Sequence, residues 1–182
     1  MSLTVYLPDS EPGPDIAHLA PSPTSLSGLR IAVLDNGKPN AALVMARAAE
    51  TLAARTGARL ELVTKKGPQG RSANAAIPCA PDIFEKVLAH ADVVITGTAD
   101  CGSCTAYSVY DTIELEKAGR PCVVVTTTQF APIAATMASS FGLPEARTLV
   151  LDHPIGGTAA TVLEQWADAA SERLVELFTR PD

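Results

Sequence analysis

The sequence predicts an α/β protein built on a three-layer, doubly wound, five-stranded parallel sheet, with an extended proline-rich arm at its N-terminus. Short apolar, β-branched runs alternate five times with longer segments in which apolar residues recur at helical spacing. The 182 residues, 47% of them apolar and 19% charged, suffice for one such core. We therefore expect an arm over residues 1–28 and a single domain over residues 29–182.

The arm is predicted from five prolines between residues 8 and 23, which exclude a helix there. Residues 3–7 have the composition of a short edge strand. Two alternatives follow for the rest: a loosely attached tail, or an arm that packs on a neighbouring subunit.

The strands and helices of the domain are predicted from periodicity and from their punctuation. Pro81 and Pro132 suit the first turn of a helix, and Gly57, Gly119 and Gly142 suit helix ends. The predicted strands cover residues 30–34, 59–63, 91–95, 122–126 and 147–151. The predicted helices cover residues 41–55, 81–90, 106–118, 131–141 and 159–178. Right-handed crossovers favour the flavodoxin-like strand order 2-1-3-4-5.

Most of the unusual polar residues follow the strands directly, at the carboxyl edge where ligands bind open α/β sheets. The loops after the first, third, fourth and fifth strands hold Asp35, Asn36, Lys38, Asp100, Cys101, Ser103, Cys104, Thr127, Thr128, Gln129, Asp152 and His153. We expect these loops to form one site. The long polar loop 65–78 is predicted to be functional or mobile.

Cys101 and Cys104 form a Cys-x-x-Cys in the turn between a predicted strand and helix. The N–H groups and dipole of a helix N-terminus favour a thiolate, and a second thiol three residues on can resolve an adduct as a disulfide. Ser103 or Thr105 is expected to cap the helix. The alternative is that both cysteines are small apolar fillers.

A zinc site is another alternative for the same pair, with Asp100 and His153 completing the ligands, although a second paired ligand motif is missing. His153 suits an acid or base, or else a loop histidine bonded to a backbone carbonyl. Asn36 and Lys38 suit the carboxylate or phosphate of a substrate, while Asn36-Gly37 is also an ordinary turn pair.

The composition excludes several function classes. The net charge of −6 and pI near 5.0 disfavour nucleic acid, and no apolar run approaches the ~20 residues of a membrane span. Without a visible signal peptide we expect a cytoplasmic protein with a small-molecule substrate. Neither a G-x-G-x-x-G nor a P-loop is present, so we predict no bound cofactor and leave electron supply to an external thiol or electron donor.

Four strings carry a family resemblance: LDNGKPN at 34–40, GTADCGSCT at 97–105, ELEKAGRP at 114–121 and HPIGG at 153–157. They resemble the UGSC family of selenoproteins and their cysteine homologues, named for a selenocysteine-Gly-Ser-Cys motif. More distantly, the stretch is similar to the selenoprotein B subunits of glycine, sarcosine, betaine and proline reductases.

The resemblance implies that Cys101 takes the place of the attacking selenocysteine, Cys104 that of its partner cysteine and His153 that of a later histidine. We therefore expect a cysteine-dependent oxidoreductase or lyase that acts on a small anionic substrate by redox chemistry or reductive cleavage. The expected substrate-binding residues are Asn36, Lys38, Asp100, Ser103, Thr105 and Thr128. A non-redox isomerase, hydratase or lyase, and a subunit of a larger complex, remain alternatives. We expect a homo-oligomer or a hetero-oligomer subunit.

Overall fold

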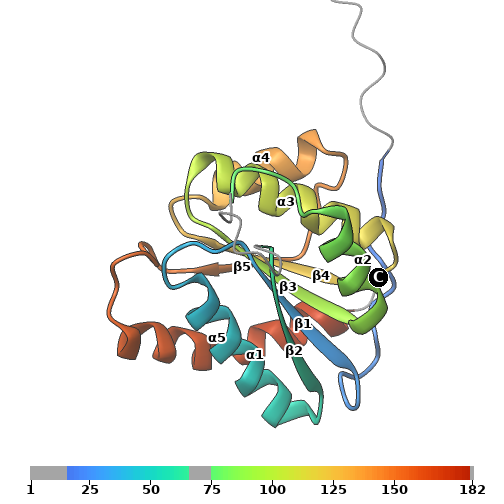
Figure 1. The fold of residues 1–182 in the computed structure, drawn as a ribbon, viewed down its shortest axis with the longest axis horizontal. Coiled ribbons are helices and arrows are strands. Elements are labelled where there is room, and N and C mark those ends of the chain that lie inside the picture. The colour runs from blue at the N-terminus through green and yellow to red at the C-terminus, as the bar shows by residue number, and fades with distance from the viewer. Residues whose placement is uncertain (1–15, 66–74, 181–182) are drawn as a thin grey trace, which may run out of the picture.

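In a computed structural model, which describes residues 16–65 and 75–180, five parallel strands form one sheet in the order β2-β1-β3-β4-β5 (Figure 1). The predicted fold class and strand order are therefore confirmed. The strands are β1 (Arg30–Asp35), β2 (Arg59–Thr64), β3 (Val93–Ala99), β4 (Cys122–Thr127) and β5 (Thr148–Leu151). The helices are α1 (Ala41–Thr56), α2 (Pro81–His90), α3 (Gly102–Lys117), α4 (Ala131–Ser140) and α5 (Ala160–Thr179).

Helices cover both faces of the sheet: α1 and α5 lie on one face, and α2, α3 and α4 on the other (Figure 1). Successive residues of a strand point to opposite faces, so Ile31 and Val33 pack in the α1/α5 core while Ala32 and Leu34 pack toward α2. Strands buried on both faces are mainly apolar, which explains why the runs over residues 31–34, 93–95 and 122–125 lack polar alternation.

Strand β3 is longer than the sequence predicts. Its expected end was Ile95, but Thr96 and Gly97 continue the pairing with β1 and Ala99 pairs with β4. Gly97 is required here because its φ is +144° and a Cβ would lie 2.8 Å from the carbonyl oxygen of Val125. The extension carries the cysteine turn beyond the sheet edge.

Residues 16–28 of the proline-rich arm pack on the same chain. The Ala17 N–H donates to the Gly142 carbonyl over 2.9 Å. Ala20 is held from both sides: its N–H donates to Glu116 Oε2 over 2.6 Å, and its carbonyl accepts from Arg147 over 2.8 Å. Glu116 and Arg147 form a fully buried ion pair beneath it. This segment is thereby tied to α3 and to the start of β5.

Three predicted features lie wholly or partly outside the described residues: the short edge strand at 3–7, the arm up to residue 15, and the centre of the long loop, residues 66–74. Within the described residues, no helix combines the length and apolarity needed to cross a membrane.

Candidate functional site

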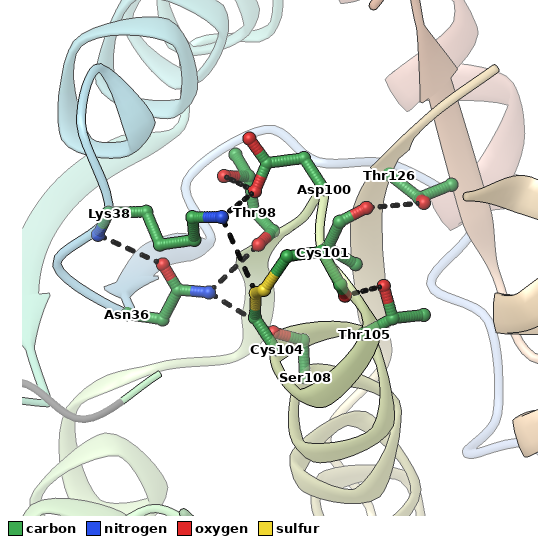
Figure 2. Close-up of a disulfide and its surroundings, with 10 residues drawn as sticks. Asn36, Lys38, Thr98, Asp100, Cys101, Cys104, Thr105, Ser108 and Thr126 are labelled. Carbon is green, nitrogen blue, oxygen red and sulfur yellow. Dashed lines mark hydrogen bonds and ion pairs between the residues drawn. A yellow bond between two sulfur atoms is a disulfide. The ribbon is translucent and has the colours of Figure 1, made fainter. Parts of the chain in front are cut away.

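The site lies where two neighbouring strands send their chains to opposite faces of the sheet. Strand β1 leads to α1 on one face and β3 leads to α3 on the other, although β1 and β3 are paired side by side. Such a switch point, at the carboxyl edge of the sheet, is where ligands bind open α/β sheets. The loop over residues 36–40 and the turn at Asp100 and Cys101 meet there, with the Lys38 side chain directed toward Asp100 and the disulfide (Figure 2).

The two cysteines of the turn are joined in the structure as a disulfide, with their Cα atoms 5.5 Å apart. Cys101 is the N-cap of α3 and partly exposed, whereas Cys104 stands in the first turn and is 1% exposed. Helix α3 begins at Gly102, four residues earlier than predicted, because the Cys101 carbonyl accepts the N–H of Thr105 over 2.9 Å.

The predicted capping by Ser103 or Thr105 is wrong. Both residues lie inside α3, and no side chain caps its first N–H groups. Thr105 instead turns its hydroxyl back to the Cys101 carbonyl over 2.6 Å, and Ser103 is exposed at the second helical position. The uncapped N-terminus leaves its positive dipole end beside the sulfur atoms.

A lysine and a carboxylate stand next to the disulfide (Figure 2). The Lys38 ammonium lies 3.5 Å from Cys104 Sγ and 2.9 Å from Asp100 Oδ1. Asp100 is 5% exposed and Lys38 22% exposed, so the pair is screened from most water. The Thr98 hydroxyl donates to the same Asp100 oxygen over 3.4 Å. A positive charge is thus fixed at the inner sulfur.

Asn36 is buried and bonded within the chain. Its Nδ2 donates to the Thr98 carbonyl over 2.9 Å and to Ser108 Oγ over 3.3 Å, while its Oδ1 accepts the Lys38 N–H over 3.3 Å. This amide joins β3, α3 and the loop that carries Lys38. Ser108 was not predicted, but it lies one helical turn after Cys104, and that spacing is the signal that could have found it.

His153 lies on the same edge of the sheet, in a second cluster after β5. Its Nδ1 is 3.1 Å from the Thr127 hydroxyl and its ring lies 5.7 Å from the Phe130 ring. Within residues 16–65 and 75–180, no hydrogen bond joins His153 to the cysteines. Thr128, at the same loop, is exposed and gives its N–H to the Leu151 carbonyl over 2.9 Å.

Asn40 links the two clusters and was not predicted as a site residue. Its side-chain amide donates to the carbonyls of Ile155 and Thr158 over 2.9 and 3.1 Å. The loop that follows His153 is therefore fastened to the start of α1, next to the Lys38 loop. Thr127, which was expected in the loops of the site but not as a catalytic or substrate-binding residue, contacts His153 directly.

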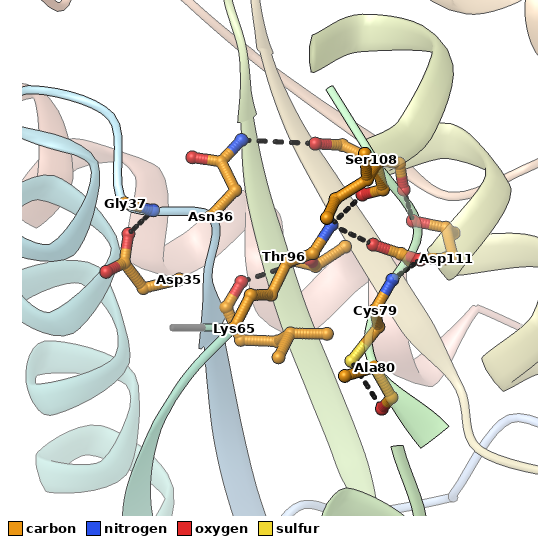
Figure 3. Close-up of polar contacts among 12 residues, drawn as sticks. Asp35, Asn36, Gly37, Lys65, Cys79, Ala80, Thr96, Ser108 and Asp111 are labelled. Carbon is orange, nitrogen blue, oxygen red and sulfur yellow. Dashed lines mark hydrogen bonds and ion pairs between the residues drawn. The ribbon is translucent and has the colours of Figure 1, made fainter. Parts of the chain in front are cut away.

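A second thiol environment lies farther along the same buried face of α3 (Figure 3). Asp111, two turns after Cys104, accepts the Lys65 ammonium over 2.5 Å and the Cys79 N–H over 2.8 Å. Lys65 also donates to the Ile77 carbonyl over 3.0 Å. Burial and then the charge of Asp111 raise the pKa of the Cys79 thiol to about 12.

Cys122 in β4 is fully buried, as predicted, and burial raises the pKa of its thiol well above the ordinary value. Neither Cys79 nor Cys122 therefore offers a thiolate near neutral pH. Across residues 16–65 and 75–180, no three His, Cys, Asp or Glu side chains gather as a metal-binding group.

We compared the sequence with protein families and the structure with solved structures. Residues 4–180 match the model of the UGSC family. No curated protein matches, and the more distant similarity to the reductase B subunits stays a prediction.

Among solved structures, rubredoxin oxygen:oxidoreductase from Desulfovibrio gigas is similar at 12% identity and a TM-score of 0.45. The match covers 85% of this chain but only 38% of that protein's length. A flavone reductase has the same identity and score over 85% of this chain and 67% of its own. A flavodoxin from Archaea is 8% identical with a TM-score of 0.40, over 80% and 99%. These likenesses carry no inference about activity.

Proposed function

This chain belongs to the UGSC family, and from its thiol turn we propose that it is a thiol-dependent enzyme, with Cys101 as the nucleophile and Cys104 as the resolving thiol. The observation that carries the proposal is the placement of both sulfurs in one disulfide, at an uncapped helix N-terminus at the switch point of the sheet. The proposed chemistry is redox or reductive cleavage of a small anionic substrate.

The exposure of the two cysteines supports this division of roles. Cys101 is partly exposed at the N-cap and can meet a substrate, while Cys104 is buried behind it and can meet only what Cys101 already carries. The family motif supports the same order, because Cys101 stands where the selenocysteine does.

The proposed cycle conserves atoms and electrons. The Cys101 thiolate bonds to an electrophilic sulfur or carbon of the substrate and expels a leaving group. The Cys104 thiolate then attacks Cys101 Sγ, forms the disulfide and releases the remaining fragment as an anion that takes a proton from a general acid of the site. At carbon, the released anion requires stabilisation by an adjacent carbonyl or carboxylate. An external dithiol or electron donor returns two electrons.

His153, steadied by Thr127, is the proposed acid for the leaving group or the released fragment. The α3 N-terminus and Lys38 are proposed to attract the substrate's anionic group, with Asp100, Ser103, Thr105 and Thr128 around it. Asn36 serves by holding the loops together. We further propose a cytoplasmic location and an oligomer, either of this chain or with other subunits, which native mass measurement of the purified protein tests.

The two thiol roles are tested with 5,5′-dithiobis(2-nitrobenzoate), a small anionic disulfide. Reduced wild-type protein should release two equivalents of thionitrobenzoate rapidly, one from attack by Cys101 and one from resolution by Cys104. Cys104→Ser should release one and keep a mixed disulfide, visible by mass. Cys79→Ser is the matched control and should behave as wild type at pH 8, because the Cys79 pKa is about 12.

A Cys101→Ser variant that reacted as rapidly as wild type would overturn the proposal. With a turned-over substrate, the same Cys104→Ser variant separates the candidates: a redox cycle stops, whereas a non-redox isomerase, hydratase or lyase that uses Cys101 alone keeps much of its rate.

A further inference from the structure

We infer that Lys38, fixed by Asp100, keeps Cys104 as a thiolate whenever the disulfide is open, and so controls both the departure and the attack of the resolving sulfur. This inference rests on the proposed function and deepens it. It gives Lys38 a role on the protein's own sulfur in addition to any contact with substrate.

The inner sulfur needs such a partner because it is buried. When a donor thiolate bonds to Cys101 Sγ, the S–S bond breaks and its electron pair passes to Cys104 Sγ. Cys104 is 1% exposed, so water cannot solvate the new negative charge well. The Lys38 ammonium, 3.5 Å from that sulfur, supplies the opposite charge where the anion forms.

Asp100 explains why the ammonium stays there. A lysine side chain is long and free to rotate, but the nearly buried Asp100 carboxylate holds its Nζ over 2.9 Å. An ammonium has three hydrogens, so it can donate to Asp100 and to Cys104 Sγ together. Asn36 adds a second restraint by accepting the Lys38 backbone N–H.

Among the described residues, the other acids near this turn have partners of their own. The Asp35 carboxylate accepts the Gly37 N–H over 2.8 Å. Asp111, the next acid along α3, is paired with Lys65 two turns away. Lys38 and Asp100 are therefore the charges that face Cys104 from the β1 and β3 loops, and α3 contributes its positive N-terminal end.

The position of Lys38 beside Cys104 also assists the step in which Cys104 attacks Cys101 and the disulfide forms again. When Cys101 carries a substrate fragment, Cys104 must already be deprotonated to attack it, because thiolates and not thiols are the nucleophiles. A thiolate paired with Lys38 needs no proton acceptor at that moment. Lys38 is thus a positioning residue for the sulfur and the charge that keeps it ionised.

The experiment isolates Cys104 in a Cys101→Ser background and follows thiolate absorbance at 240 nm from pH 4 to 9.5, with Cys101→Ser/Cys104→Ser as baseline. Cys79 and Cys122 stay protonated over most of this range, because burial raises the pKa of both thiols. Adding Lys38→Met should raise the midpoint of Cys104 ionisation by about 1–3 pH units, the effect of removing a neighbouring opposite charge.

Two further variants make the result specific. Lys38→Arg should keep most of the low midpoint, since it keeps the charge. Lys117→Met, which removes an exposed lysine paired with Glu114 on the same helix, should leave the midpoint unchanged. If Lys38→Met fails to fold, Lys38→Gln gives the same comparison with a shorter polar side chain.

An unchanged or lowered midpoint in Lys38→Met would overturn the inference, and so would an equal rise in Lys117→Met. Neither result contradicts the proposed function, because that function is tested separately by the release of two equivalents of thionitrobenzoate from wild-type protein. If Lys38→Met raised only the KM for an anionic substrate, Lys38 would bind substrate and not govern the sulfur.

Discussion

Two regions of this protein combine the same three groups, a lysine, an aspartate and a cysteine, beside one face of α3, and they arrange the charges differently around the sulfur atoms. At the thiol turn, the ammonium of Lys38 reaches the sulfur of Cys104. Two helical turns away, the ammonium of Lys65 is bonded to Asp111 and to a backbone carbonyl, and Asp111 is bonded to the Cys79 N–H.

The difference teaches that the position of the charges, and not their presence, decides what a thiol does. At the turn, a cation and a helix N-terminus face the sulfur and favour its anion. At Cys79, burial and the nearby carboxylate outweigh the cation, so the pKa of the thiol rises to about 12. The first arrangement suits chemistry, and the second suits closing the base of the loop between β2 and α2.

The largest expected effect comes from breaking the structural pair. Lys65 and Asp111 are 4% and 2% exposed, so Lys65→Met leaves a buried carboxylate without its cation. We expect a loss of about 3–5 kcal/mol in the free energy of unfolding, measured in urea at pH 7. Lys117→Met, which breaks an exposed pair, should cost at most about 0.5 kcal/mol.

The stability lost in Lys65→Met should depend on pH, and the direction of that dependence follows from the pKa of Asp111. Burial raises the pKa of Asp111 above its ordinary 3.8, with Lys65 opposing that rise, so removing Lys65 raises the pKa further. The native state then binds the proton more tightly than the unfolded state, and this contribution to stability is lost as pH rises above 3.8. Lys65→Met should therefore be less destabilised at pH 4 than at pH 7. Equal losses would contradict this account of Asp111.

A smaller effect is expected on the rates at which the cysteines of the reduced protein are alkylated. At pH 8 a thiol with a pKa of about 12 is about one part in 10,000 thiolate. We expect iodoacetamide to modify Cys101 at least ~100-fold faster than Cys79, measured by peptide mass over time. Buried Cys122 should also remain unmodified. Comparable rates at Cys79 and Cys101 would remove the contrast between the two regions.

The smallest expected effect tests whether exposed charge also reaches Cys79. Asp82, in the first turn of α2, contributes to the raised pKa of that thiol, after burial and Asp111. Asp82→Asn should speed alkylation of Cys79 about twofold at low salt, and the gain should vanish at 1 M salt because exposed charges are screened. Glu85→Gln on the same helix is the matched control; a similar gain there would show a general helix effect.

The polar groups at the carboxyl ends of the strands show what could be predicted. That Lys38 and Asp100 would lie near the cysteines followed from the strand order, because parallel strands end at one edge. The start of α3 could not be predicted as well: Gly102 and Ser103 are weak helix formers, and the first turn forms because the Cys101 carbonyl accepts two bonds from Thr105.

Roles that depend on particular hydrogen-bond partners were the hardest to predict. Asn36 and Asn40 have the same side chain in one loop, yet Asn36 joins β3 to α3 and Asn40 holds the loop after His153. No local pattern separates them. The partners come from segments more than 60 residues away and are fixed only when the sheet forms.

By itself, the sequence determined the alternation of strands and helices, the order of the sheet and the location of the thiol turn at its carboxyl edge. These follow from periodicity and crossover handedness, which are properties of the chain pattern. Only the tertiary structure decided that Lys38 contacts a sulfur in addition to Asp100, whereas Lys65 is bonded to Asp111 and to a backbone carbonyl. That choice depends on distances of a few ångströms, over which electrostatic energy changes steeply in a buried site. For that reason a cation contacts the sulfur of Cys104, whereas a carboxylate accepts the backbone N–H of Cys79.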